Sequence, residues 1–113
     1  MIRSKERVLP AIWGQDCRAW ELLASADLSI KHEHMPAGTQ EVRHYHVHAQ
    51  QFFFVLSGVL TLELSGHQHE LGKHEGIPVP SGEKHQAINA GDDPVEFLVI
   101  SSPSTSGDRI EVP

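Results

Sequence analysis

Three histidines and a glutamine have the residue types and the spacing of a metal-binding site. His44 and His46 are separated by one residue, and alternate side chains of a β-strand point to the same face, so both imidazoles can reach one ion. Gln51 follows five residues after His46, and His85 lies far downstream. Because imidazole binds first-row transition metals such as Zn, Ni, Fe and Co, this arrangement is typical of a mononuclear metal site.

The pair of histidines is weak support by itself. The sequence holds 9 histidines in 113 residues, and the same spacing recurs at residues 32 and 34, 46 and 48, and 67 and 69. Some pairs of this kind are therefore expected by chance. The residues around His44 and His46 decide the interpretation.

Those surrounding residues resemble the two signatures of the cupin superfamily, G-x5-H-x-H-x3–4-E-x6-G and G-x5-P-x-G-x2-H-x3-N. Eight of the ten fixed positions match, and they are Gly38, His44, His46, Gly58, Pro80, Gly82, His85 and Asn89. The two departures are Gln51, where the family has glutamate, and His74, where it has the opening glycine. The motifs span residues 38–89 in the expected order.

The resemblance implies an all-β fold, a double-stranded β-helix also known as the jelly-roll or cupin barrel. It implies one small domain over residues 1–113, and one divalent transition metal ion (Zn, Ni, Fe, Mn or Co) bound by His44, His46, Gln51 and His85. Asn89 is expected to support its loop through side-chain hydrogen bonds.

Length and charge agree with a small protein that acts on small molecules. A chain of 113 residues is one domain, and 9 basic against 15 acidic residues give a net charge of −6 with no basic run, which disfavours nucleic-acid binding. No window has the length and apolarity of a signal peptide or a membrane span, so a cytoplasmic location is expected. Cys17 is the only cysteine and reads as a packed small hydrophobe. Residues 1–10 and 103–113 are expected to be loosely held.

Turn signals recur at short intervals and separate runs rich in Val, Ile, Leu, Phe and Thr, which is the pattern of an all-β protein. The predicted strands cover residues 28–35, 42–47, 51–56, 59–65, 77–79, 85–89 and 95–101. Residues 18–24 fit neither the helical nor the strand period cleanly, and the resemblance makes them a strand.

The run Phe52-Phe53-Phe54-Val55-Leu56 lacks the polar alternation of a strand with one wet face. If Gln51, Phe53 and Val55 point into the barrel, Phe52, Phe54 and Leu56 point outward. The chain's own N-terminal residues or a second subunit must then cover them. Because cupins are often dimers through such a surface, we expect a homodimer.

The remaining polar residues give a less specific signal. His48 is expected in a loop, His67 and His69 in solvent, and His74 in the loop between Gly72 and Gly76. His32 and His34 lie on a strand that could face the mouth of the cavity. The candidates for proton transfer are His32, His34, Glu33, Glu41 and Glu63, and the strand register decides between them.

Gln51 favours one kind of chemistry. A neutral amide leaves a divalent ion with its full charge and makes it a stronger Lewis acid than a glutamate would. This resembles small sugar-acid-processing cupins and points to isomerisation or ketonisation of a small sugar, sugar acid or keto acid. Two other functions stay open: an Fe(II) dioxygenase with the same ligands, and a non-catalytic module that binds a small molecule.

Overall fold

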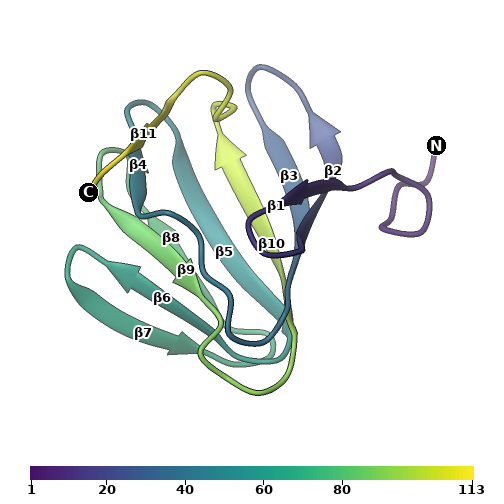
Figure 1. The fold of residues 1–113 in the computed structure, drawn as a ribbon. Helices are drawn as coiled ribbons and strands as arrows, with labels where there is room; N and C mark the ends of the chain where they lie inside the picture. Colours follow the sequence, from purple (N-terminus) through teal and green to yellow (C-terminus); the bar gives the residue numbers. More distant parts are fainter.

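The computed structural model describes residues 1–113 and consists of strands, turns and loops (Figure 1). The structure offers no helical segment that could span a lipid bilayer. The strands are β1 (Ala11–Trp13), β2 (Cys17–Ala24), β3 (Ser29–Met35), β4 (His44–His46), β5 (Gln50–Ser57), β6 (Leu60–Leu64), β7 (His67–Leu71), β8 (Gly76–Val79), β9 (His85–Ile88), β10 (Val95–Ser102) and β11 (Arg109–Glu111). The prediction of an all-β fold is confirmed.

Two antiparallel sheets enclose the core. One has the order β1-β2-β3-β10-β5-β8, and the other has the order β11-β4-β9-β6-β7. Neighbours in each sheet are often distant in sequence, because the chain alternates between the two layers (Figure 1). A cluster of 12 buried apolar residues fills the space between them, with Phe97, Met35, Leu60 and Leu62 among its largest fully buried members. This packing fixes the inward face of every strand that carries a candidate ligand.

Strand β5 has the alternation expected from its phenylalanines. Gln51, Phe53 and Val55 are buried on the inner face, whereas Phe52 on the outer face is 38% exposed. Phe52 stacks on Phe54 at a centroid distance of 6.4 Å. The N-terminal residues leave Phe52 partly uncovered, so the outer side of β5 stays partly accessible in a single chain.

The ambiguous pattern of residues 18–24 has a structural cause. They belong to β2, whose pairing with β3 shifts register between Glu21 and Leu23. Such a bulge puts an extra residue, Leu22, into the strand and breaks the two-residue period. Trp20 before the bulge and Leu23 after it pair with His32 and Ile30, which lie on one face of β3.

The C-terminal residues differ from the expectation of a loosely held segment. Residues 109–111 form β11, which pairs with β4 so that Arg109 lies opposite His46 and Glu111 opposite His44. Asp108 is only 7% exposed. At the other end, Lys5 forms an ion pair of 2.8 Å with Glu96, which fastens part of the N-terminal segment to β10.

Strand β7 is absent from the strands that the sequence predicted. Its first four residues are exposed polar side chains with little preference for a strand, and His67 and His69 are in solvent as expected. The strand forms because the turn at Ser65 and Gly66 returns the chain against β6 over five paired positions. Pairing with a neighbour outweighs local preference here.

His74 explains why the family pattern has a glycine at its position. Its φ of 65° lies in the left-handed region, where a residue without a side chain is favoured. The His74 ring stacks on Phe54 with centroids 6.1 Å apart and an interplanar angle of 6°. The turn therefore keeps the glycine-like backbone, and the imidazole covers part of an outward phenylalanine.

Asn89 has the supporting role that was predicted for it. Its Nδ2 donates to the carbonyl oxygens of Met35, Pro36 and Asp93, and its Oδ1 accepts from the Gly91 N–H. The side chain thus ties the end of β3 to the loop that leads into β10. Cys17 is fully buried, as expected for a packed small residue.

Candidate metal centre

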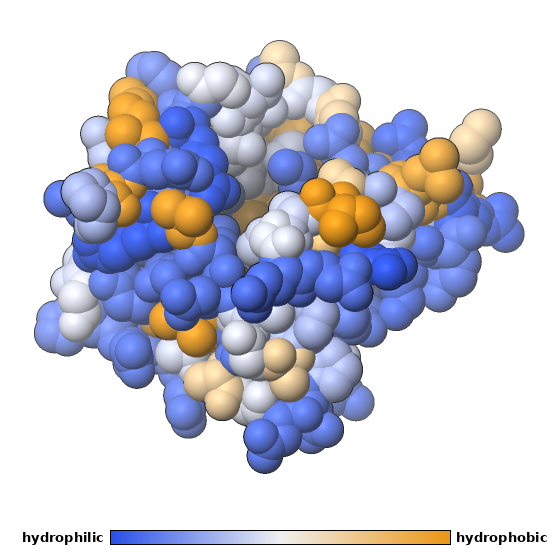
Figure 2. All heavy atoms as spheres, viewed as in Figure 1, coloured by the Kyte–Doolittle hydropathy of each residue, from blue (hydrophilic) through white to orange (hydrophobic).

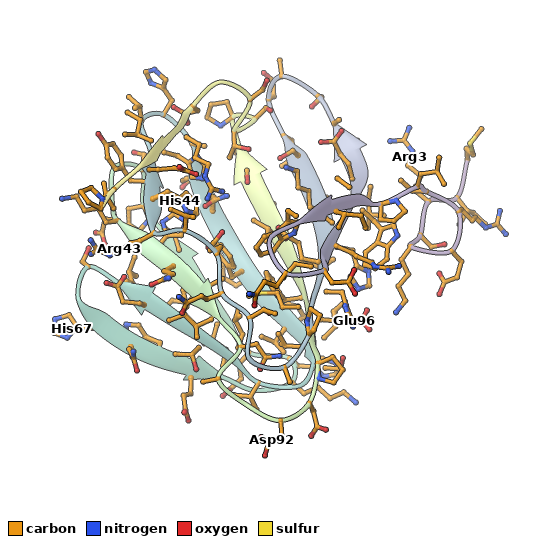
Figure 3. All side chains as sticks on the ribbon, in the orientation of Figure 1. Arg3, Arg43, His44, His67, Asp92 and Glu96 are labelled. Carbon is orange, nitrogen blue, oxygen red and sulfur yellow. The ribbon has the colours of Figure 1, made fainter.

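The fold brings the three predicted histidine ligands to one point. His44 and His46 project from β4 and His85 from β9, and the nearest ring nitrogens all lie within 4.8 Å of one another. Their exposed fractions are 3%, 5% and 1%. Figure 3 places His44 between the two sheets, whereas His67 points away from the molecule at the β6–β7 edge. The strand alternation predicted for the His44/His46 pair is what aims both rings inward.

Backbone hydrogen bonds fix the orientation of two of these rings. His44 Nδ1 lies 2.8 Å from the Val42 carbonyl oxygen, and His85 Nδ1 lies 3.0 Å from that of Glu83. A carbonyl only accepts, so each Nδ1 carries the proton and each Nε2 keeps its lone pair. This is the arrangement found where a histidine binds a metal through Nε2.

Several buried polar atoms of the cluster have no partner within the protein. They are His85 Nε2, His46 Nδ1 and Gln51 Oε1. A buried polar atom without a hydrogen bond costs roughly 1–3 kcal/mol, and such atoms rarely gather at one place. Because the ring nitrogens of the histidines converge, these atoms fit a metal ion, which would replace the missing partners.

The protonation of the histidines suits the same role. Burial lowers the pKa of His44 to about 3 and that of His46 to about 4. Burial also lowers the pKa of His85. All three imidazoles are therefore neutral at pH 7, which is the form that binds metals.

Gln51 lies in the same cavity wall and is oriented by a neighbour. Its Nε2 donates to Ser101 Oγ at 3.1 Å, which turns Oε1 away from Ser101 and leaves it without a partner. Ser101 lies opposite Gln51 in the β10–β5 pair. The oxygen, the better metal ligand of the two amide atoms, is therefore the free one.

Two of the three histidines, His44 and His46, border a cavity of about 170 Å³. Its lining consists of Trp13, Lys31, Glu33, Glu41, His44, His46, Gln51, Phe53, Ala87, Phe97, Val99, Ser101, Thr105 and Arg109. An outer hollow of about 490 Å³ shares five of these residues, so the inner cavity opens through it. Figure 2 shows a hollow on the face seen in Figure 1, bordered by hydrophilic residues and, at its lower right, also by hydrophobic ones.

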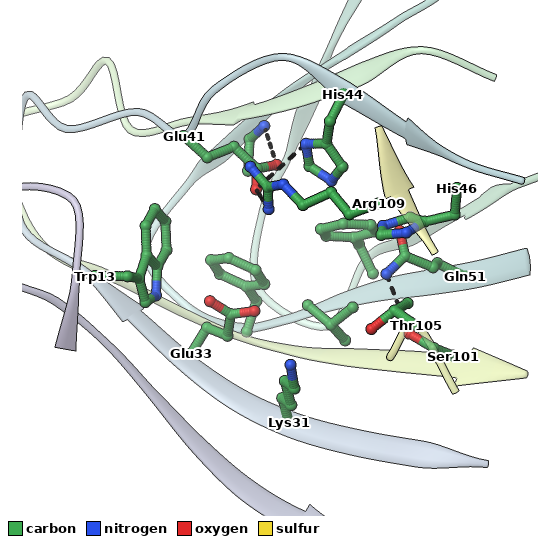
Figure 4. Close-up of a pocket in the computed structure, with 14 residues that line it drawn as sticks. Trp13, Lys31, Glu33, Glu41, His44, His46, Gln51, Ser101, Thr105 and Arg109 are labelled. Carbon is green, nitrogen blue, oxygen red and sulfur yellow. Dashed lines mark hydrogen bonds and ion pairs between the residues drawn. The ribbon is translucent and has the colours of Figure 1, made fainter. Parts of the chain in front are cut away.

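Two carboxyl groups at the mouth have perturbed acidity (Figure 4). Burial raises the pKa of Glu33 to about 7, against a smaller lowering effect of Lys31. Burial, and then the charge of Glu33, raise the pKa of Glu41 to about 8. Glu41 Oε1 lies 3.9 Å from His44 Nδ1. Carboxyl groups that titrate near neutral pH can both take up and release a proton.

The other candidates for proton transfer point away from the cavity. His32 and His34 pair with Leu98 and Glu96 on the outer face of the sheet, and His32 Nε2 lies 2.7 Å from Glu96 Oε1. The expectation that this pair could face the cavity mouth is therefore wrong, because the alternate residues of β3 face inward. Glu63 also lies outside, where it binds Arg43 at 2.9 Å.

Sequence reasoning missed the contribution of the C-terminal segment. Thr105 and Arg109 line the cavity, and Asp108 fastens the segment to the loop between His46 and Gln51. The Asp108 carboxylate accepts hydrogen bonds from the backbone N–H groups of Val47, His48 and Ala49 at 2.9–3.1 Å. Burial raises the pKa of Asp108, but these bonds outweigh it and hold the pKa below its usual value.

No residue pattern in the sequence predicts the contact between Asp108 and the loop that follows His46. Lys31, on the inner face of β3, was missed for a different reason. Lys31 and Glu33 are two residues apart and share one face of β3, but the sequence does not show whether that face points inward.

Comparison with known proteins identifies the class. The family profile described as Cupin domain matches residues 31–101, and the chain belongs to the cupin family. The polyketide synthase CurC of Streptomyces cyaneus is 29% identical over 69 residues, or 61% of this chain and 45% of that protein. This chain spans 45% to 62% of the length of the curated relatives that it matches.

Two solved structures are similar over most of the chain. KdgF from Halomonas sp. has a TM-score of 0.83 at 17% identity, with 92% of this chain and 94% of that chain covered. The polyketide cyclase RemF from Streptomyces resistomycificus has a TM-score of 0.80 at 21% identity, with 92% and 80% covered. At such identities the similarity establishes the fold, and the prediction of a double-stranded β-helix is confirmed.

Proposed function

We propose that this cupin is a metal-dependent enzyme that isomerises or ketonises a small sugar, sugar acid or keto acid. One divalent ion, Zn, Ni, Fe, Mn or Co, would be held by His44, His46, Gln51 and His85. The observation that carries the proposal is the convergence of three buried histidines, together with buried polar atoms of His46, His85 and Gln51 that have no partner in the protein. Bound there, the ion would supply Lewis-acid polarisation of a carbonyl or hydroxyl oxygen.

The neutral donor set supports this chemistry over oxidation. Three neutral imidazoles and one amide leave the charge of the ion undiminished, whereas a glutamate would favour a higher oxidation state. Gln51 is held with its oxygen free by Ser101, which matches a ligand role. The Fe(II) dioxygenase is the alternative that the same ligands would permit, and the experiment below separates the two.

Glu33 is the residue that we assign to proton transfer. It lines both the inner cavity and the outer hollow. A substrate bound beside His44 and His46 would therefore share the inner cavity with the Glu33 carboxyl group. Isomerisation and ketonisation require a group that takes a proton from one atom of the substrate and returns it to another. A carboxyl group with a pKa of about 7 is suited to both steps. Glu41 is the second candidate on the same wall.

The size of the cavity favours a small substrate. A volume of about 170 Å³ equals roughly five or six water-sized volumes of about 30 Å³ each. The names of CurC and RemF connect two similar proteins with polyketides, and a polyketide is therefore a second class to test. Such a molecule would have to occupy the outer hollow, since the inner cavity is too small for several fused rings.

The test is the exchange of the methyl protons of pyruvate for deuterium in D₂O, followed by NMR under strict anaerobiosis with Zn- or Ni-loaded protein. We expect exchange that is lost in His85→Ala, strongly reduced in Glu33→Gln and unchanged in Glu70→Gln, an exposed control on β7. Exchange without oxygen excludes the dioxygenase. Oxygen consumption with Fe(II) and no anaerobic exchange would contradict the proposal, and binding without any conversion would favour the non-catalytic module.

We also propose that the chain forms a homodimer through the outer face of the six-stranded sheet. Phe52 and Phe54 on β5 lie opposite Ile100 and Leu98 on β10, so four large apolar side chains share this face. Phe52 is 38% exposed in a single chain. Light scattering at micromolar concentration should give twice the mass of the chain, and a single monomeric species would contradict the dimer. A cytoplasmic location stays a prediction.

A further inference from the structure

Lys31 is a cation inside the cavity that no group of the protein neutralises directly. Its side chain lines both the inner cavity and the outer hollow, and it forms no hydrogen bond or ion pair within the protein. Glu21 lies opposite Lys31 in the β2–β3 pair, yet the two side chains form no ion pair. In Figure 4 the Lys31 side chain rises into the cavity from the wall opposite His44 and Arg109.

The other charged groups at the mouth are engaged elsewhere. Arg109 lies 3.9 Å from Glu41 and 3.7 Å from Glu111, and its Nη2 donates to the Val42 carbonyl oxygen. Glu41 Oε2 accepts from the Ala87 N–H at 2.8 Å. These contacts hold the Arg109–Glu41 pair together on the far wall. Of the two cations that line the cavity, Arg109 has these partners and Lys31 has none.

Glu33 is the only acidic side chain of the lining that shares a strand face with Lys31. It follows two residues later on β3, and no oxygen of Glu33 comes within ion-pair distance of the Lys31 ammonium. Burial raises the pKa of Glu33 to about 7, so near neutral pH this carboxyl group carries only part of its charge. The cavity therefore has an excess of positive charge on the Lys31 side.

We propose that Lys31 binds the carboxylate of the substrate, which makes this enzyme specific for a small carboxylic acid. The inference rests on the proposed function, because it places the carbonyl or hydroxyl end of the same molecule at the histidine cluster. The roughly five or six water-sized volumes of the cavity suit a short 2-keto or 2-hydroxy acid, and Lys31, His44 and His46 all line that cavity. A half-buried ammonium with no other partner would favour the carboxylate over the neutral amide of the same acid.

Binding of pyruvate and of its neutral analogue pyruvamide tests this inference. Calorimetric titrations would use Zn-loaded wild-type protein, Lys31→Gln and the control Lys73→Gln, whose lysine is exposed in the loop before His74. Wild type and Lys73→Gln should bind pyruvate about tenfold or more tightly than pyruvamide, as expected when a charged hydrogen bond is lost. Lys31→Gln should lose that preference while it keeps the metal content of the wild type.

The outcomes separate this inference from the proposed function. If Lys31→Gln still prefers pyruvate to pyruvamide at full metal content, or if wild type binds neither, the carboxylate site is wrong. The proposed function fails on other readouts, namely metal content that does not respond to the loss of His85 or the absence of anaerobic proton exchange. A folded Lys31→Gln protein is verified by its circular dichroism before either ligand is added.

Discussion

His44 and His85 lie directly opposite each other in the pairing of β4 with β9, and the centroids of their rings are 4.4 Å apart. One residue comes from each of the two sequence motifs, and strands β5 to β8 lie between them along the chain. A strand pair with this register brings the two motifs together without any contribution from a loop. The relative position of His44 and His85 is therefore set by the sheet that carries them.

Removal of a histidine of the cluster should abolish stoichiometric metal binding. We expect protein purified without a histidine tag or added metal to contain near-stoichiometric metal by mass spectrometry, and His46→Ala and His85→Ala to lose it. The loss of affinity should exceed the roughly 10–100-fold typical of an outer-shell change, because a direct donor disappears. His67→Ala, an exposed histidine on β7, is the matched control. Unchanged metal in His85→Ala would place the ion elsewhere.

Asp108 should act on the metal centre although it lies outside the cavity lining. Replacement by alanine removes the acceptor of the N–H groups of Val47, His48 and Ala49, so the loop between His46 and Gln51 loosens. We expect Asp108→Ala to lower the thermal midpoint and to weaken Zn binding by about tenfold. Asp108→Asn keeps one acceptor oxygen, so its thermal midpoint and Zn affinity should lie between those of the wild type and Asp108→Ala.

Asp92→Ala, in an exposed turn, serves as the control for this pair of variants. Zn affinity is compared at a temperature at which every variant is folded. Equal affinities there, with only the thermal midpoint lowered, would mean that Asp108 stabilises the fold without positioning the ligands.

Glu33 should make the stability of the metal-free protein depend on pH. Its pKa is about 7 in the folded state against a usual value of 4.5, so between these values the folded protein holds a proton that the unfolded chain has released. Folding therefore becomes less favourable as the pH rises from 4.5 to 7, and the loss is complete above 7. Glu33→Gln should raise the free energy of unfolding above pH 7 and leave it nearly unchanged below pH 4.5.

Urea unfolding at several pH values measures this difference, with Glu70→Gln as the exposed control. A gain in stability of Glu33→Gln that is the same at every pH would show that the effect comes from packing or from the loss of a hydrogen bond and not from titration.

Substitutions of His74 should separate backbone strain from ring contact. Both His74→Ala and His74→Gly lose the stacking on Phe54, but only glycine relieves the left-handed φ of 65°. The glycine variant should be the more stable of the two by about 1 kcal/mol in urea unfolding. Equal stabilities would mean that the turn relaxes to another conformation when the ring is absent.

The sequence allowed the fold and the histidine cluster to be predicted because their signals are local. The His-x-His spacing needs only the alternation of a strand, and the burial pattern of β5 follows from its continuous apolar run. Strand register is different, since a slip of one residue exchanges the two faces. For this reason His32 and His34 were considered for the cavity when Lys31 and Glu33 actually line it.

The C-terminal wall of the cavity could not be predicted for another reason. Arg109 enters the lining because β11 adds to the edge of β4, and Asp108 is buried because three N–H groups of a distant loop need an acceptor. Neither contact leaves a periodic or motif-like trace in residues 103–113. Such partners become visible only when the tertiary structure brings them together.

The hydrogen bond between Asp108 and Ala49 joins residues 59 positions apart, and it has a kinetic consequence. An unfolded chain offers an ion only the neighbouring histidines 44, 46 and 48, because His85 joins them only through a contact between residues far apart in sequence. Uptake of an ion should thus follow the collapse of both sheets. The free energy of its binding would then stabilise the entire domain against unfolding, and not a single hairpin.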